Sequence, residues 1–91
     1  MWYVYILESL KDHDNYVGLT DDLRERWEKH NQGKVISTKF RKPLKLIYYE
    51  AYLNKHDAAN REQFLKTGWG KKWIKKNLKN YFKSKSKKLG G

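Results

Sequence analysis

The pattern of apolar positions in the first twenty residues predicts two paired strands. Residues 1–9, MWYVYILES, carry apolar side chains on both alternating faces. This pattern is typical of a strand that is covered on both sides and central in its sheet. A polar turn over residues 11–15 leads into residues 15–19, NYVGL, which we expect to pair back onto the first strand. Gly18 has no side chain, so it suits a bend or a close backbone approach at the end of this strand.

A charged helical pattern follows directly over residues 21–31. The segment opens with aspartate side chains that can cap a helix, and Glu25 follows Asp22 at the spacing of a capping box. Arg26 and His30 are one turn apart, so their side chains lie on the same face of the helix.

The next apolar segment predicts a third strand and a second helix. Residues 44–52, LKLIYYEAY, are rich in Leu, Ile and Tyr, and Pro43 suits the start of a strand. Residues 58–67 contain mostly good helix formers. Glu62 lies beside the inward-facing apolar stripe of that helix. A charged carboxylate next to a buried face is expected to have a partner or a function.

The C-terminal part is dominated by lysine. Gly68 and Gly70 are expected to break the second helix, and residues 71–82 resume a helical pattern with lysines outside an apolar face. Residues 84–91, SKSKKLGG, are polar and glycine-rich, so we expect a disordered basic tail. The sequence therefore predicts a single domain over residues 1–83.

Composition limits the possible partners. The chain has 91 residues, no cysteine and 15% aromatic residues, so a small aromatic core must stabilise it without disulfides. Twenty-one Lys and Arg against 10 Asp and Glu give a net charge of +11. Such an excess attracts polyanions, with nucleic acid as the first candidate and an anionic membrane surface as the second.

Several absences narrow the expected setting. No apolar run approaches the ~18 residues of a membrane span, and the N-terminal apolar run ends at Glu8 without a preceding basic segment. Zinc motifs, a phosphate-binding loop and a serine or cysteine nucleophile set are missing from the sequence. We therefore expect a cytoplasmic protein, monomeric, without a small-molecule cofactor or a membrane partner.

Two groups of basic residues are candidates for binding nucleic acid. The first lies in the loop over residues 32–43, which is either a solvated connection or a phosphate-contacting loop. The second lies on the predicted C-terminal helix. The candidates are Lys34, Lys39, Arg41, Lys42, Lys71, Lys72, Lys75 and Lys76.

Four residues of the N-terminal half could carry chemistry. Tyr5 and Tyr16 are ordinary strand residues by themselves, because a phenol with a pKa near ~10 needs help to act as a base. The neighbouring helix offers that help through the Arg26 guanidinium and the His30 imidazole, which can carry protons near neutral pH. An arginine fork also matches the oxygens of a phosphate. His13 and His56 lack such partners, and we expect both at the surface.

Glu62 has two possible roles. It could form a structural ion pair with Arg61 or Lys66. It could also bind a divalent ion, since Mg²⁺ keeps several waters and takes one or two carboxylates plus phosphate oxygens of the substrate. A bound metal would then act as a Lewis acid.

The order Tyr5, Tyr16-Val17-Gly18, Arg26 and His30 resembles the signature of the GIY-YIG nuclease superfamily. The chain is similar to its small single-domain members and to the catalytic domain of the UvrC excision nuclease. The resemblance covers roughly residues 2–74. It implies an α+β fold in which helices flank a three-stranded antiparallel sheet.

The resemblance also implies a role for each residue. Tyr5 and Tyr16 fall on the two motif tyrosines, one of which would help to activate water. Arg26 falls on the phosphate-stabilising arginine, His30 on a position that assists proton transfer, and Glu62 on the metal-binding glutamate. The implied activity is hydrolysis of DNA phosphodiester bonds with one Mg²⁺ or Mn²⁺ ion, structure-directed or weakly sequence-specific, in DNA repair or recombination.

Leu19 departs from the family pattern. Several members carry a lysine or a small hydroxyl residue there, so a non-cleaving nucleic-acid-binding module with the same fold remains an alternative. A basic adaptor for an acidic protein is a third possibility, which no specific feature of the sequence supports.

Overall fold

A three-stranded antiparallel sheet forms the centre of the molecule. The computed structural model describes residues 1–90, with side chains to Ser84. The strands are β1 (Trp2–Ser9), β2 (Asn15–Thr20) and β3 (Leu44–Tyr52), in the order β2-β1-β3. Strand β1 pairs with both neighbours, so its predicted central position is confirmed.

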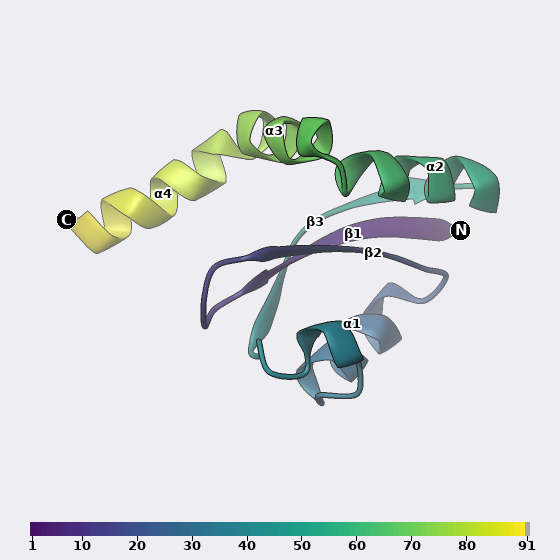
Figure 1. Ribbon diagram of the computed structural model, residues 1–91, viewed down its shortest axis with the longest axis horizontal. Coiled ribbons are helices and arrows are strands. Elements are labelled where there is room, and N and C mark those ends of the chain that lie inside the picture. Colours follow the sequence, from purple (N-terminus) through teal and green to yellow (C-terminus); the bar gives the residue numbers. More distant parts are fainter. Residues whose placement is uncertain (91) are drawn as a thin grey trace.

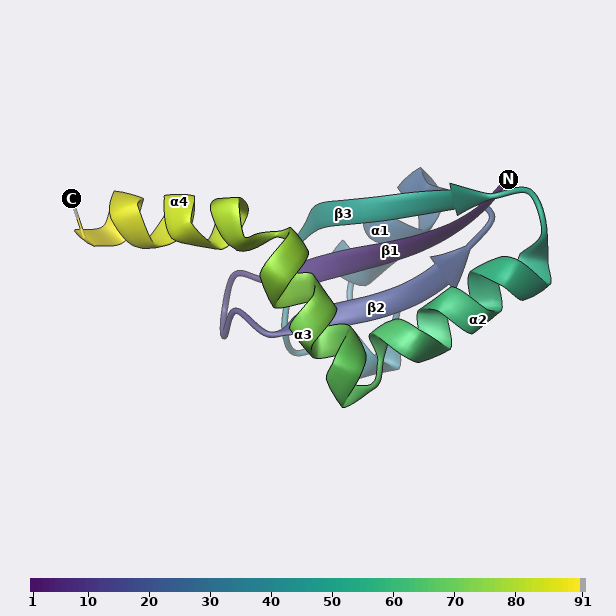
Figure 2. The same cartoon turned by 90° about the horizontal axis from the view of Figure 1, so that it is seen from above.

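Helices cover both faces of this sheet (Figure 1). Helix α1 (Leu23–Asn31) lies on one face, and helices α2 (Lys55–Leu65) and α3 (Gly68–Asn77) lie on the other. Helix α4 (Lys79–Gly90) extends beyond the end of the sheet, as the view from above shows (Figure 2). A short 3-10 helix, η1 (Ile36–Thr38), lies in the connection between α1 and β3. The predicted α+β fold is therefore confirmed.

Capping side chains fix where the helices begin. The carboxylate of Asp22 accepts a hydrogen bond from the backbone N–H of Glu25 at 3.1 Å, at the predicted capping spacing. Asn54 accepts from the backbone N–H of His56 at 2.8 Å and so starts α2. Each cap pairs a backbone donor that the first turn of a helix otherwise leaves without a partner.

The two faces of β1 build two separate cores. Val4 and Ile6 pack against residues of α2 and α3, whereas Tyr5 and Leu7 pack on the face that carries α1. The alternation of apolar residues over positions 1–9 is thus explained by burial on both sides of one strand. The buried partners on the α2 and α3 side are Ala58, Leu65 and Ile74.

The helix boundaries around the two glycines differ from the prediction. Helix α3 begins at Gly68, with the Thr67 hydroxyl accepting from the backbone N–H of Gly70 at 3.1 Å. A side chain at Gly70 would overlap backbone atoms of Phe64 and Leu65, so this glycine permits close contact between α2 and α3. Gly70 therefore serves packing inside a helix rather than ending one.

The C-terminal helical region is also divided differently. It consists of α3 and α4 with Leu78 between them, where the sequence predicted one helix over residues 71–82. Helix α4 continues to Gly90 through a segment that we expected to be disordered, and Gly91 lies outside the described residues. Lysine and leucine are good helix formers, and no proline interrupts them. Within residues 1–90, no helix is long and apolar enough to cross a membrane.

Candidate active site

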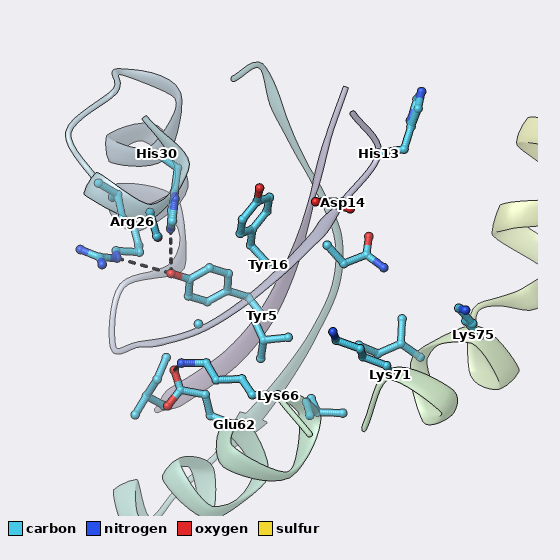
Figure 3. A pocket seen from close by; sticks show the side chains of 18 residues that line it. Tyr5, His13, Asp14, Tyr16, Arg26, His30, Glu62, Lys66, Lys71 and Lys75 are labelled. Carbon is cyan, nitrogen blue, oxygen red and sulfur yellow. Dashed lines mark hydrogen bonds and ion pairs between the residues drawn. The ribbon is translucent and has the colours of Figure 1, made fainter. Parts of the chain in front are cut away.

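A cleft of about 730 Å³ opens beside β2, the edge strand next to β1. Residues from α1 and from the following loop line one side of it, and residues from α2 and α3 line the other. Figure 3 shows the Tyr5 ring reaching into this space, with the α1 residues on one side and Glu62 on the other. The cleft brings together all five residues predicted as catalytic: Tyr5, Tyr16, Arg26, His30 and Glu62.

The absence of a side chain at Gly18 places Tyr5 in this cleft. Gly18 lies opposite Tyr5 in the β1–β2 pairing, and the phenol ring crosses over it. A Cβ atom at position 18 would overlap Cζ and the hydroxyl oxygen of Tyr5. The close approach at Gly18 is thus made by a side chain, whereas we expected backbone atoms or a bend, and the strand continues past Gly18 to Thr20.

A chain of polar contacts runs from Arg26 through Tyr5 and His30 to Thr38. The Tyr5 hydroxyl lies 2.9 Å from Nε2 of His30, and Nε of Arg26 donates to the same hydroxyl at 3.4 Å. On the far side of the imidazole, Nδ1 lies 2.7 Å from the hydroxyl of Thr38. Figure 3 shows both contacts that converge on the Tyr5 oxygen.

Burial determines the protonation states of Tyr5 and His30. Burial raises the pKa of Tyr5 above its usual value of 10.0, and the opposing influence of Arg26 is smaller. Burial, together with the positive charge of Arg26, lowers the pKa of His30 from 6.5 to about 4. At neutral pH Tyr5 and His30 are therefore a protonated phenol hydrogen-bonded to a neutral imidazole. Burial thus moves the pKa of His30 below the neutral range in which we expected the ring to carry protons, because the side chain is almost fully removed from water.

The low pKa of His30 predicts a pH dependence of stability. The unfolded chain takes up a proton on this ring near pH 6.5, whereas the folded protein resists protonation until about pH 4. The free energy of unfolding should therefore fall as the pH drops from about 6.5 to 4, by about 2–3 kcal/mol from this group. Urea unfolding of the wild type and of His30→Gln across this range measures the effect. His56→Gln, which changes an exposed ring, serves as the control, and equal slopes for wild type and His30→Gln would contradict the assignment.

Tyr16 also lines the cleft but is placed differently from Tyr5. It packs beside the cluster that contains Tyr5, Leu7 and Leu44. The Tyr5 hydroxyl, not that of Tyr16, is the one that Arg26 and His30 contact. The geometry thus distinguishes two phenols that the sequence left equivalent.

Glu62 faces the cleft from α2. Its carboxylate is 15% exposed and forms an ion pair with Nζ of Lys66 at 3.1 Å. The other suggested partner, Arg61, instead pairs with Glu50 at 2.9 Å. The structural ion pair considered for Glu62 is therefore present in the free protein, with Lys66.

The donor set is compatible with one weakly held divalent ion. Among residues with described side chains, no group of three or more His, Cys, Asp or Glu residues could enclose a metal. A hard cation such as Mg²⁺ accepts a single carboxylate when water and substrate phosphate complete its shell. Glu62 meets that requirement, provided that Lys66 releases it.

The predicted basic residues are distributed unevenly around the site. Lys71 and Lys75 line the cleft together with the catalytic candidates. In the loop, Val35 and Ser37 line the cleft, while the Arg41 guanidinium pairs with Asp12 at 3.2 Å. The other predicted basic residues, Lys34, Lys39, Lys42, Lys72 and Lys76, are exposed and do not line the cleft.

The sequence did not indicate how two polar residues would contribute to the site. Thr38 lies in the loop over residues 32–43, where the sequence indicated only phosphate contacts, yet it is fully buried against His30. Lys66 was considered only as an ion-pair partner, yet it lines the cleft. The two histidines predicted at the surface, His13 and His56, are exposed, and His13 borders the cleft 3.7 Å from the Glu8 carboxylate.

Comparison with known proteins identifies the family. The model of the GIY-YIG catalytic domain matches residues 1–88 of this chain. The chain belongs to the GIY-YIG family. The resemblance inferred from the two tyrosine motifs, Arg26 and His30 is therefore confirmed.

Several similar proteins carry the UPF0213 name. A UPF0213 protein of Clostridium perfringens is 43% identical over 67 residues, which are 72% of this chain and 71% of the relative. One from Pediococcus acidilactici is 38% identical over 82 residues, 87% of this chain and 82% of the relative. One from Pediococcus pentosaceus is 41% identical over 80 residues, 84% and 83% of the two chains. No solved structure matches the chain.

Proposed function

We propose that this protein is a divalent-metal-dependent endonuclease that hydrolyses DNA phosphodiester bonds, with structure-directed or weak sequence specificity. One observation carries the proposal. The Tyr5 hydroxyl is hydrogen-bonded to Arg26 and His30, and these side chains face the Glu62 carboxylate across one cleft. The net charge of +11 supports a polyanionic substrate. A role in DNA repair or recombination, a cytoplasmic location and a monomeric state belong to the same proposal.

Tyr5 is the residue that we assign to the attacking water. Its oxygen would accept a proton from that water while its own proton passes to Nε2 of His30, 2.9 Å away. The imidazole is neutral at physiological pH, and its lowered pKa makes it a weak acceptor for that proton. A general base must lie within hydrogen-bond reach of the proton it takes, and a water in the cleft would meet that condition.

Arg26 would hold the phosphate. Its Nε contact with Tyr5 is long, at 3.4 Å, so the guanidinium can turn toward an incoming phosphate at little cost. Its nitrogens match two phosphate oxygens and would stabilise the charge that develops in the transition state. Lys71 and Lys75 would hold neighbouring phosphates of the strand along the cleft.

Glu62 would hold the metal ion, which would act as a Lewis acid at the phosphate and stabilise the leaving oxygen. For this the Glu62–Lys66 ion pair must open. The Lys66 side chain is 49% exposed, so its ammonium can leave the mostly buried Glu62 carboxylate for solvent or for a phosphate. The released ammonium of Lys66 would then be available to the phosphate.

The test is nicking of supercoiled and branched DNA with Mg²⁺ or Mn²⁺, with wild type beside Glu62→Ala. We expect the wild type to nick in a metal-dependent way that EDTA abolishes. The rate of Glu62→Ala should fall about 10²-fold at low metal concentration and recover partly at high Mn²⁺, because phosphate and water still hold the ion. Glu25→Gln, which breaks the i,i+4 pair with Lys29 on α1, is the matched control and should retain activity.

A non-cleaving binding module is the second candidate function. Leu19 lines the cleft as an apolar residue and packs against the core, so it offers no polar assistance to either tyrosine. Tight, salt-dependent binding by wild type and Glu62→Ala without any product would favour this module. Nicking that survives in both Glu62→Ala and Arg26→Ala would indicate a contaminating nuclease.

A further inference from the structure

We propose that Trp69, with Lys72 beside it, is a stacking site for an unpaired base of the DNA strand that leaves the cleft. The inference rests on the proposed function and deepens it, because it names the substrate class as DNA with unpaired nucleotides next to the cut. Aromatic side chains bind single strands by stacking on bases that are free of a duplex.

Trp69 is far more exposed than the other tryptophans of the chain. It lies in the first turn of α3 and is 72% exposed. Trp2 is partly buried, with the ammonium of Lys55 4.7 Å from its ring centre. Trp73 is partly buried as well, with the guanidinium of Arg61 at 4.3 Å. Exposure of one ring does not by itself indicate a partner, so the charges around Trp69 carry the argument further.

The surroundings of Trp69 are positively charged. The ammonium of Lys72 lies 4.8 Å from the centre of the indole ring. Because Trp69 is still 72% exposed, Lys72 covers only a small part of it. No aspartate or glutamate follows Glu62 in the sequence, whereas α3 carries lysines on most of its surface. An open aromatic ring among cations without acidic neighbours is the combination with which proteins bind single-stranded nucleic acid.

Helical spacing connects Trp69 to the cleft. Trp69, Lys72 and Lys75 follow one another at intervals of three residues, so each side chain is a neighbour of the next along α3. Lys75 lines the cleft together with the catalytic candidates. The helix rise places Trp69 about 9 Å along the axis from Lys75. At ~3.4 Å per nucleotide this distance corresponds to a few nucleotides, so a strand that leaves the cleft across Lys75 and Lys72 reaches the indole.

Phe40 provides a matched comparison for Trp69. It is also 72% exposed, and the ammonium of Lys39 lies 5.5 Å from its ring centre. Residues 38–42 do not line the cleft, and the Arg41 guanidinium is paired with Asp12. Phe40 thus shares the exposure and the neighbouring cation of Trp69 but not its place beside the site.

The first arm of the test is binding in EDTA, where no metal-dependent cleavage occurs. The probes are a short fluorescent oligothymidylate and a blunt duplex of the same length, followed by anisotropy. We expect Trp69→Ala to weaken binding of the single strand by about 5- to 100-fold, the range that loss of one stacked base gives, with little change for the duplex. Trp69→Phe should recover most of the loss, and Phe40→Ala should bind like the wild type.

The second arm locates the contact by tryptophan fluorescence. Oligothymidylate should quench the emission of the wild type and of Phe40→Ala, because a base stacks on the Trp69 indole. It should quench the emission of Trp69→Phe much less, although that variant still binds. Since Trp69 is largely exposed, these substitutions should leave the fold intact, which circular dichroism checks.

Three results would overturn the stacking site. They are wild-type affinity of Trp69→Ala for the single strand, an equal loss in Phe40→Ala, and an equal loss for single strand and duplex. The same applies if vesicles of phosphatidylserine, and not oligothymidylate, bind in a way that requires Trp69, because the surface would then contact a membrane.

Binding without metal separates this inference from the proposed nuclease. If single-strand binding requires Trp69 but the wild type cleaves no DNA with Mg²⁺ or Mn²⁺, the proposed nuclease fails while the stacking site stands. If the wild type nicks DNA and Trp69→Ala binds single strands like the wild type, the nuclease stands and the stacking site fails.

Discussion

Gly18→Ala is expected to remove nearly all nuclease activity, about 10³-fold in rate, although no reacting group is altered. The new methyl group would overlap the Tyr5 ring, so the phenol must leave its position over β2. Displacement of a catalytic group by about 1 Å can cost 10²-fold, and here the contacts to both Arg26 and His30 would also be lost. Overpacking at this site should further lower the free energy of unfolding by about 1–3 kcal/mol.

Gly68→Ala is the matched control for this substitution. It adds the same methyl group at a helix start where no neighbouring atom lies within 4 Å, so activity and stability should stay near wild type. Nicking assays and urea unfolding of the two variants measure both effects. A Gly18→Ala protein with wild-type kcat would mean that the position of Tyr5 over Gly18 has no part in the reaction.

Arg26→Ala is expected to lower kcat by about 10²–10³-fold, the range found when a group that stabilises transition-state charge is removed. The guanidinium is the cation that contacts the Tyr5 hydroxyl, and its charge also helps to keep His30 neutral. Its loss should therefore raise the pKa of His30 toward 6.5 and displace the acid limb of the pH–rate profile. Nicking rates measured from pH 5 to 9 report both effects.

Two variants make this experiment specific. Arg24→Ala removes an exposed guanidinium from the same helix and should leave the rate unchanged. Arg26→Lys keeps the charge without the planar fork. Its pH–rate profile should therefore resemble that of the wild type, while its kcat should stay well below the wild-type value. Equal rates for Arg26→Lys and wild type would show that the positive charge alone, and not two-pronged phosphate contact, is required.

The sequence predicted the sheet and the first helix because strong local signals coincide there. Apolar residues on both faces of positions 1–9 require cover on both sides, and the structure supplies it from α1 and from α2 with α3. Asp22 and Glu25 mark the start of α1 through a local hydrogen bond. Helical spacing then places Arg26 and His30 on one face, whatever the rest of the fold.

The C-terminal helices and the partners of the site could not be predicted in this way, because distant contacts determine them. Gly70 looks like a helix breaker in sequence, but its close contact with Phe64 and Leu65 makes it part of a helix interface. The burial that lowers the pKa of His30 and the hydroxyl of Thr38 behind its ring depend on the folded loop. Residue spacing carries no signal for either.

The active-site groups rest on parts of the fold that differ in how firmly they are held. Tyr5 belongs to the central strand, which is hydrogen-bonded on both sides and buried from Val4 to Ser9. His30 and Thr38 belong to a nine-residue helix and a three-residue turn in which each is the single buried side chain. Segments with few buried contacts open locally before the whole domain unfolds, so hydrogen exchange at α1 and η1 should be faster than at β1. Persistence of the sheet in mild denaturant is therefore no measure of the integrity of the site.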